Sequence, residues 1–228
     1  MYTLYIGNKN YSSWSLRPWV LMRALGIDFE ERLIPFGTTT PGGRIADVSP
    51  SARVPCLHDG HLRVWDSLAI VEYLDEREQG VWPETAAARA WARCAAAEMH
   101  AGFGALRQHC SMTCGQRIAL HHEPAALRAD LGRLGMLWTE GLSLWGGPWL
   151  AGADFTAVDA FYAPVAFRIQ TYGLVLPAPA LDYAHRLLAL PAMQQWYAEA
   201  LEETFREPAH EKELVEAGLV TADFRRTT

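Results

Sequence analysis

The chain has 228 residues, half of them hydrophobic and a fifth charged, so we expect a packed core and exclude an intrinsically disordered chain. Its 26 acidic and 20 basic residues give a formal net charge of −6, which argues against a nucleic-acid binder with a basic face. Residues 1–6 lack a basic leader and no apolar stretch is long enough for a bilayer, so we expect a cytoplasmic protein without a membrane partner.

The first third of the chain alternates strand and helix patterns. The expected strands and helices cover 3–6 (strand), 17–25 (helix), 31–36 (strand), 54–58 (strand), 62–65 (strand) and 67–78 (helix). Asp59-Gly60 is a dipeptide that favours a tight hairpin turn between the last two strands. Because a strand-helix-strand unit favours a parallel pair and a hairpin is antiparallel, the sequence predicts a small mixed sheet.

The second part of the chain has a different character. Residues 79–83 look like a linker, and from Glu84 onward alanine-rich helical patterns replace the strand patterns. We therefore divide the chain into an α/β domain over 1–79 and an all-helical domain over 84–228. Thr156 and Asp159 have the spacing of a capping box, in which each side chain accepts a free backbone N–H at a helix start.

The most informative segment joins the first strand to the first helix and contains Ser12, Ser13 and Ser15. A helix N-terminus offers free N–H donors and the positive end of the helix dipole. Pro18 costs little only in the first turn of a helix, which makes Ser15 the expected cap. The hydroxyl of Ser12 or Ser13 then stays free for other work, although turn and cap roles for all three serines are the alternative.

Two residue pairs stand at later boundaries. Val54-Pro55 enters a strand; most such bonds are trans, but a cis bond would turn the Val54 N–H and C=O toward an extended peptide. Ser67 at a helix start makes a site for a carboxylate, and Asp66 beside it could hold an amine. Taken singly, each is also an ordinary cap or first-turn residue.

In this order and spacing, the three motifs resemble those of the glutathione S-transferase family, in particular its bacterial, serine-type members with a zeta-like motif. The resemblance covers nearly the whole chain. It implies a thioredoxin-like α/β domain followed by an all-α domain, in a homodimer whose clefts lie between the domains. It also implies conjugation of glutathione, as co-substrate, to a small hydrophobic electrophile in detoxification.

The resemblance implies that Ser12, with Ser13 as second choice, stabilises the glutathione thiolate. Lowering a thiol pKa from about 8.5 by two units requires roughly 2.7 kcal/mol. One hydrogen bond to a charged group contributes roughly 1.5–3 kcal/mol and a helix N-terminus about 0.3–1 kcal/mol. A serine hydroxyl could therefore suffice as donor, without a catalytic base.

The rest of glutathione would meet the other two motifs. The resemblance implies that Val54, beside a cis Pro55, binds the cysteinyl backbone. Asp66 would bind the γ-glutamyl amine and Ser67 the γ-glutamyl carboxylate. Arg53 is a weaker candidate for the glycyl carboxylate.

Two other functions are open at this stage. A glutathione-dependent isomerase such as maleylacetoacetate isomerase fits the serine run, but the zeta signature continues with Arg-x-Arg where this chain has Arg17-Pro18-Trp19. A non-catalytic interaction module of the same fold is the other, and the presence of all three motifs weighs against it.

Other chemistries are disfavoured. No cysteine lies between positions 7 and 18, which excludes a dithiol mechanism there and disfavours mixed-disulfide chemistry. The histidines and cysteines within 109–122 fit no standard zinc spacing, so we expect no metal. The resemblance also implies that the first long helix of the second part faces the substrate cleft, so Met99, Phe103 and Arg107 are candidates to touch the electrophile. Packing of Met99 and Phe103 in the core is the alternative.

Overall fold

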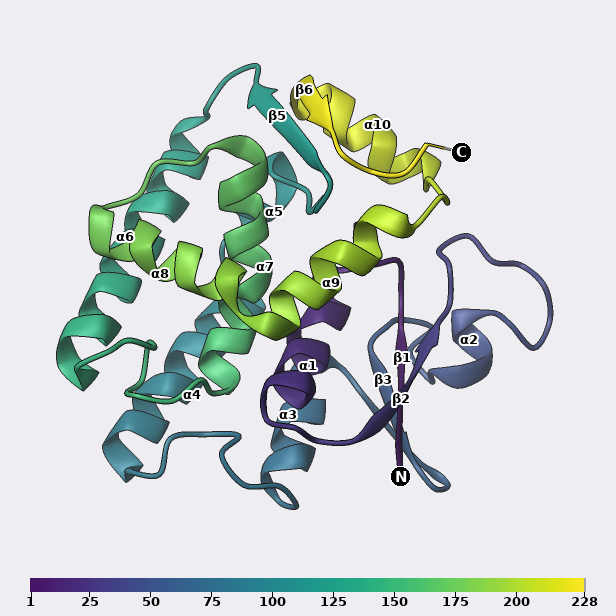
Figure 1. The fold of residues 1–228 in the computed structure, drawn as a ribbon, viewed down its shortest axis with the longest axis horizontal. Helices are drawn as coiled ribbons and strands as arrows, with labels where there is room; N and C mark the ends of the chain where they lie inside the picture. Colours follow the sequence, from purple (N-terminus) through teal and green to yellow (C-terminus); the bar gives the residue numbers. More distant parts are fainter. Residues whose placement is uncertain (228) are drawn as a thin grey trace.

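A four-stranded sheet forms the N-terminal part of this computed structural model, which describes residues 1–227 (Figure 1). Its strands are β1 (Tyr2–Ile6), β2 (Phe29–Leu33), β3 (Cys56–Asp59) and β4 (Leu62–Trp65). The spatial order is β2-β1-β3-β4. β1 pairs parallel with β2 and antiparallel with β3, and β3 and β4 form the expected hairpin, with Gly60 at φ 59°. The mixed sheet is therefore confirmed.

Three helices belong to this part: α1 (Ser13–Ala24), α2 (Ile45–Val48) and α3 (Ser67–Asp75). α1 packs against α3 and β1 on one side and against α7 and α9 of the helical part on the other. Leu16, Trp19 and Val20 of α1 consequently have no exposed surface. A helix that is covered on both sides in this way needs no polar stripe, and it holds its N-terminus firmly at the junction of the two parts.

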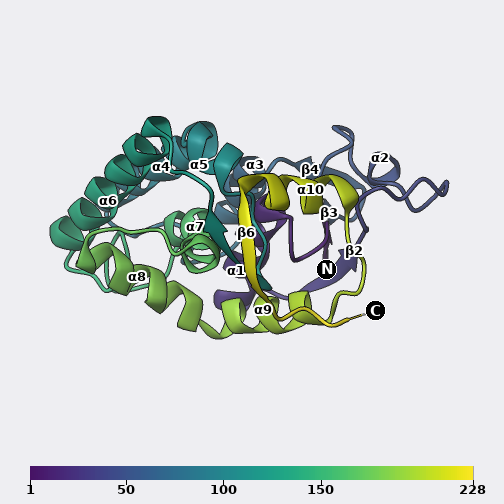
Figure 2. The ribbon, with the colours of Figure 1, turned by 90° about the horizontal axis from the view of Figure 1, so that it is seen from above.

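The remainder is predominantly helical, as expected for a thioredoxin-like domain followed by a helical one. Its helices are α4 (Ala86–Ala101), α5 (Gly104–His109), α6 (Ala125–Trp145), α7 (Ala157–Tyr172), α8 (Ala178–Ala189), α9 (Pro191–Glu202) and α10 (Pro208–Ala217). Figure 2 shows α7 enclosed by its neighbours, and nearly all of its side chains are buried. None of the helices within residues 1–227 has the length and apolarity of a membrane span.

The start of α7 uses the acidic half of the expected capping box. Asp159 accepts a hydrogen bond from the backbone N–H of Thr156 at 3.0 Å. The Thr156 hydroxyl, in contrast, makes no hydrogen bond within the described residues. Asp159 also accepts from Leu150 and Tyr183, so the carboxylate ties the helix start to a loop and to α8.

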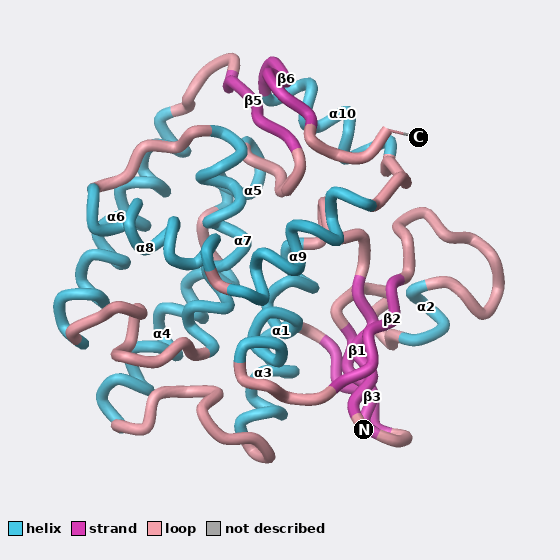
Figure 3. Tube along the Cα trace, in the orientation of Figure 1, coloured by secondary structure: helices cyan, strands magenta, loops and turns pink. Residues whose placement is uncertain are grey.

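The helical part also carries a two-stranded sheet that the sequence did not predict. β5 (Gln116–Leu120) pairs antiparallel with β6 (Gly218–Asp223), apart from the main sheet (Figure 3). A side chain at Gly218 would collide with the Ala119 carbonyl, so only glycine allows this close approach. The pairing of β6 with β5 fixes the C-terminal segment to the body of the molecule.

Candidate functional site

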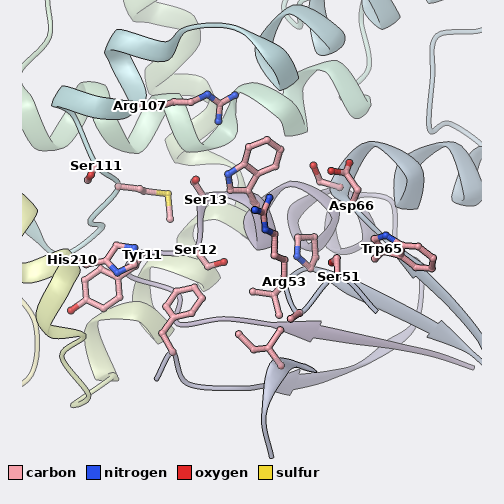
Figure 4. A pocket seen from close by; sticks show the side chains of 18 of the residues that line it. Tyr11, Ser12, Ser13, Ser51, Arg53, Trp65, Asp66, Arg107, Ser111 and His210 are labelled. Carbon is pink, nitrogen blue, oxygen red and sulfur yellow. The ribbon is translucent and has the colours of Figure 1, made fainter. Parts of the chain in front are cut away.

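A pocket of about 780 Å³ opens at the N-terminus of α1, between the α/β part and the helical part (Figure 4). Its volume lies within the range of small-molecule sites. The six residues expected to contact glutathione all line this pocket, although they come from three separate segments: Ser12, Ser13, Arg53, Val54, Asp66 and Ser67.

The helix that carries the serines begins earlier than expected. α1 starts at Ser13 with Ser12 at the N-cap position, so the prediction that Ser15 is the cap was wrong. The buried Ser15 hydroxyl instead accepts hydrogen bonds from the Gly7 N–H at 3.2 Å and from the Ser12 hydroxyl at 2.7 Å. Pro18 lies inside the helix and is fully buried there. Packing on both sides of α1 outweighs the one backbone hydrogen bond that this proline removes.

The two candidate hydroxyls differ in their hydrogen bonding. Ser12 donates to Ser15, whereas the Ser13 hydroxyl makes no hydrogen bond within the described residues. Ser12 and Ser13 are only 5% and 7% exposed, and both side chains line the pocket. The Ser13 hydroxyl is therefore ready to donate to a ligand, and the Ser12 hydroxyl can do so only after leaving Ser15.

The Val54–Pro55 peptide bond is cis, as the resemblance implied. Val54 lines the pocket beside Arg53. The neighbouring Cys56 is fully buried in β3, and burial raises the pKa of its thiol. Cys56 is therefore a core residue and not a nucleophile, because the thiolate is the reactive form.

Asp66 and Ser67 occupy the opposite end of the pocket from α10. Asp66, rather than Ser67, is the N-cap of α3, and its carboxylate accepts from the Leu68 N–H at 2.8 Å. Its φ of 76° is unusual for a residue other than glycine and is typical of functional positions. Ser67 is the first residue of the helix, and its fully buried hydroxyl accepts from Arg17 at 3.3 Å. The His100 ring lies 3.7 Å from the Asp66 carboxylate.

The far end of the pocket is closed by α10, which sequence reasoning missed. The His210 ring stacks on Tyr11 and on Phe36, with centroid distances of 5.0 and 5.5 Å. The Tyr11 hydroxyl donates to Glu211, and the buried Arg225 binds both groups. The hydrogen bonds of Tyr11 with Glu211 and Arg225 join residues 200 and 214 positions apart, and no local pattern around 202–216 signals them.

Comparison with known proteins finds a likeness over the segment that carries the three motifs. The family model of the glutathione S-transferase N-terminal domain matches residues 11–77, which include all three motifs. The N-terminal part of the chain is therefore similar to the N-terminal domain of glutathione S-transferases.

Solved structures extend the likeness in fold to the helical part. A glutathione transferase from Methylococcus capsulatus is 23% identical, with 88% of this chain and 100% of that chain covered and a TM-score of 0.67. Glutathione transferase Omega 3C from Trametes versicolor is 17% identical, with 94% and 91% covered and a TM-score of 0.68. The theta-class glutathione S-transferase from Xanthomonas axonopodis, solved with glutathione bound, is 22% identical, with 86% and 96% covered and a TM-score of 0.63.

Only one of the three residues expected near the electrophile reaches the pocket. Arg107 of α5 lines it together with Arg168 of α7. Met99 and Phe103 are buried in the core instead. The chain breaks between α4 and α5, where Phe103 has φ 54° and turns its ring onto Tyr162. A continuous helix, as assumed from the sequence, would have placed these side chains differently.

No group of three or more His, Cys, Asp or Glu side chains within residues 1–227 is placed to hold a metal ion. Burial raises the pKa of the Cys110 thiol to about 12, and Cys114 is likewise buried. The polar groups that line the pocket are hydroxyls, guanidinium groups, the Asp66 carboxylate and the His210 ring.

Proposed function

We propose that this chain conjugates glutathione to a small electrophile and that a serine hydroxyl at the N-terminus of α1 stabilises the glutathione thiolate. The observation that carries the proposal is the free Ser13 hydroxyl, with Ser12 beside it, in one pocket with Val54 and Asp66. Glutathione bound to the related theta-class protein from Xanthomonas axonopodis supports glutathione as the co-substrate.

The pocket offers a contact for each part of the tripeptide. In Figure 4 the serines lie between Asp66 on one side and Tyr11 and His210 on the other. A γ-glutamyl group bound at Asp66 would extend its chain past the backbone of Val54, as an extended peptide does along a strand. The thiol would then lie at the serines. Tyr11 and His210 would border the space for the second substrate.

The two serines are not equivalent as thiolate donors. The resemblance implies Ser12, whereas the hydrogen bonding favours Ser13. Ser12 would have to give up its bond to Ser15, which costs about 1 kcal/mol. Ser13 can donate without any rearrangement, and its place in the first turn adds the helix dipole to its hydrogen bond.

The test measures the pKa of the bound thiol from the pH dependence of thiolate absorbance, in wild type, Ser12→Ala and Ser13→Ala. Loss of the true donor should raise the thiol pKa by a unit or more, equivalent to about 1.4 kcal/mol. Ser111→Ala is the matched control, because Ser111 also lines the pocket but donates to Glu213 at 2.8 Å. An unchanged pKa in both serine variants would refute the serine mechanism, and no retention of wild type on immobilised glutathione would refute the whole function.

Three further expectations accompany this function. We propose that the chain is a homodimer, that it acts in the cytoplasm, and that its role is detoxification. Light scattering after size-exclusion chromatography tests the dimer, since the mass of one chain is 25.4 kDa. A single species of about twice that mass is expected, and a monomer at all concentrations would contradict it.

A further inference from the structure

α5 and α7 form one wall of the pocket, and the arginines of this wall have no carboxylate partner within residues 1–227. Arg107 and Arg168 line this wall, and the guanidinium of Arg17 in α1 lies 4.9 Å from the centre of the Phe161 ring of α7. Among residues 1–227, none of these three arginines forms an ion pair within 4.0 Å. Buried guanidinium groups are usually paired with carboxylates, so this grouping needs an explanation.

The three charges are close enough to act on one another. Burial lowers the pKa of Arg17 well below its usual value, and the positive charges of Arg107 and Arg168 lower it further. Burial also lowers the pKa of Arg168 to about 10, and the charge of Arg107 adds to that effect. Arg168 is only 4% exposed and Arg17 is fully buried, so water screens this repulsion poorly.

Backbone carbonyl groups hold both wall arginines in place but leave one terminal nitrogen of each free. Arg107 donates through Nε and Nη2 to carbonyls at the end of α4. Arg168 donates through Nε to Cys110 at 2.8 Å and through Nη1 to Pro164 at 3.4 Å. Nη1 of Arg107 and Nη2 of Arg168 make no hydrogen bond within the described residues. Capping of helix ends therefore explains the positions of these side chains but not the remaining donors.

Acidic side chains near this wall are already engaged. Asp66 is the only carboxylate among the residues that line the pocket, and it caps α3 and faces His100. Asp130 accepts from the backbone of Leu106 at 2.9 Å, and Glu213 accepts from Ser111. The pocket is thus lined by one carboxylate and by three arginines, which are Arg53, Arg107 and Arg168.

The wall also faces the serines. Figure 4 shows the Arg107 side chain above Ser13, whereas Arg53 lies beside the serines, on the side of Ser51 and Asp66. The Arg107 guanidinium is 4.9 Å from the centre of the Trp14 ring, which lines the pocket. A ligand group bound at Arg107 would therefore lie above Ser13, next to the Trp14 ring.

We propose that the second substrate carries a carboxylate, which Arg107 and Arg168 bind together on this wall. The inference rests on the proposed function for the identity of the co-substrate, and it replaces the small hydrophobic electrophile that the resemblance implied with an acidic one. Planar guanidinium groups match carboxylate oxygens in geometry. A bound anion would also relieve the repulsion among Arg17, Arg107 and Arg168.

The test compares two unreactive probes that differ by one carboxylate, 3,5-dinitrobenzoate and 1,3-dinitrobenzene. Binding is followed by quenching of tryptophan fluorescence, since Trp14 lines the pocket. Wild type should bind the benzoate at least 10-fold more tightly than the neutral probe. Arg107→Gln should reduce this preference below 3-fold with little change for the neutral probe, and Arg107→Lys should retain most of it.

Two further variants make the result specific. Arg53→Gln changes the other arginine of the pocket, and Arg133→Gln changes an arginine that pairs with Glu98 outside it. Both should keep the preference for the benzoate. The proposal is overturned if wild type shows no preference, if the preference survives in Arg107→Gln, or if it disappears in Arg53→Gln.

The probes do not require glutathione, so the two proposals can fail separately. A chain that ignores glutathione but prefers the benzoate through Arg107 would refute the conjugation and keep the anion site. A chain that binds glutathione but binds both probes equally well would refute the anion site and keep the conjugation. Circular dichroism melting of Arg107→Gln and Arg107→Lys checks that both variants fold.

Discussion

Asp159 is a fully buried carboxylate on which three hydrogen bonds converge. It accepts from the N–H groups of Leu150 and Thr156 at 3.0 Å each and from the Tyr183 hydroxyl at 2.8 Å. Asp159→Ala would leave these three donors without an acceptor at the start of α7. We predict that this single change is among the most destabilising in the helical part.

The size of the effect follows from two opposing contributions. Each orphaned buried donor costs about 2 kcal/mol, or about 6 kcal/mol for three. Burial raises the pKa of Asp159 from 3.8 to about 6. Removing the charged carboxylate at pH 7 therefore raises the free energy of unfolding by roughly 3 kcal/mol, which offsets part of this loss. Asp159→Ala should therefore lower the free energy of unfolding by about 3 kcal/mol at pH 7.

The pH dependence gives the prediction a second signature. Because the folded-state pKa lies above the unfolded value of 3.8, the folded protein binds more protons between pH 4 and 6. The stability that Asp159 contributes by protonation is complete below about pH 4 and disappears as the pH rises through 6. At pH 5 it amounts to about 1 kcal/mol, so the difference between wild type and Asp159→Ala should be larger at pH 5 than at pH 7.

Urea denaturation at both pH values measures these differences, provided that unfolding is cooperative. The control is Asp154→Ala, an exposed acid in the loop before α7, which should change the free energy of unfolding by less than about 0.5 kcal/mol. A loss below about 1 kcal/mol in Asp159→Ala at pH 7 would refute the reasoning. So would a difference from wild type that shrinks between pH 7 and pH 5.

Two glycines of α6 should respond to alanine in opposite directions. A methyl group at Gly141 would lie 2.7 Å from the Leu150 carbonyl oxygen, so Gly141→Ala should lower the free energy of unfolding by about 1–3 kcal/mol. Gly132 has open space around it, so Gly132→Ala should raise the free energy of unfolding by about 0.5–1 kcal/mol. Equal effects of the two variants in urea denaturation would contradict this prediction. Alkylation of the native protein, read by peptide mass spectrometry, should modify the exposed Cys94 and spare Cys110, where burial raises the thiol pKa to about 12; rapid labelling of Cys110 would contradict its burial.

Features that depend on a few neighbouring residues were predictable. The hairpin forms at Asp59-Gly60, and the Asp159 carboxylate caps the start of α7, as the sequence indicated. Turn and cap chemistry acts over two to four residues, so its pattern is legible in the chain itself. The expected site residues also meet in one pocket, because each stands at the end of a strand or the start of a helix in the α/β part.

The exact use of each serine was not predictable in the same way. Local reasoning from Pro18 assigned the helix cap to Ser15, and the structure places Ser12 there. The burial of α1 between two parts of the molecule decides this, since packing can compensate for one missing backbone hydrogen bond. Ser15 then becomes the acceptor that holds Ser12, which leaves Ser13 as the free hydroxyl.

By itself, the sequence determined the mixed sheet, the helical second part and a set of residues that line one pocket. Only the tertiary structure decided that His210 closes the pocket, that β6 pairs with β5, and that Arg107 and Arg168 face the serines from one wall. These contacts join segments roughly 60 to 200 residues apart along the chain. Local propensity does not encode such pairings, because they form only when the whole core has packed.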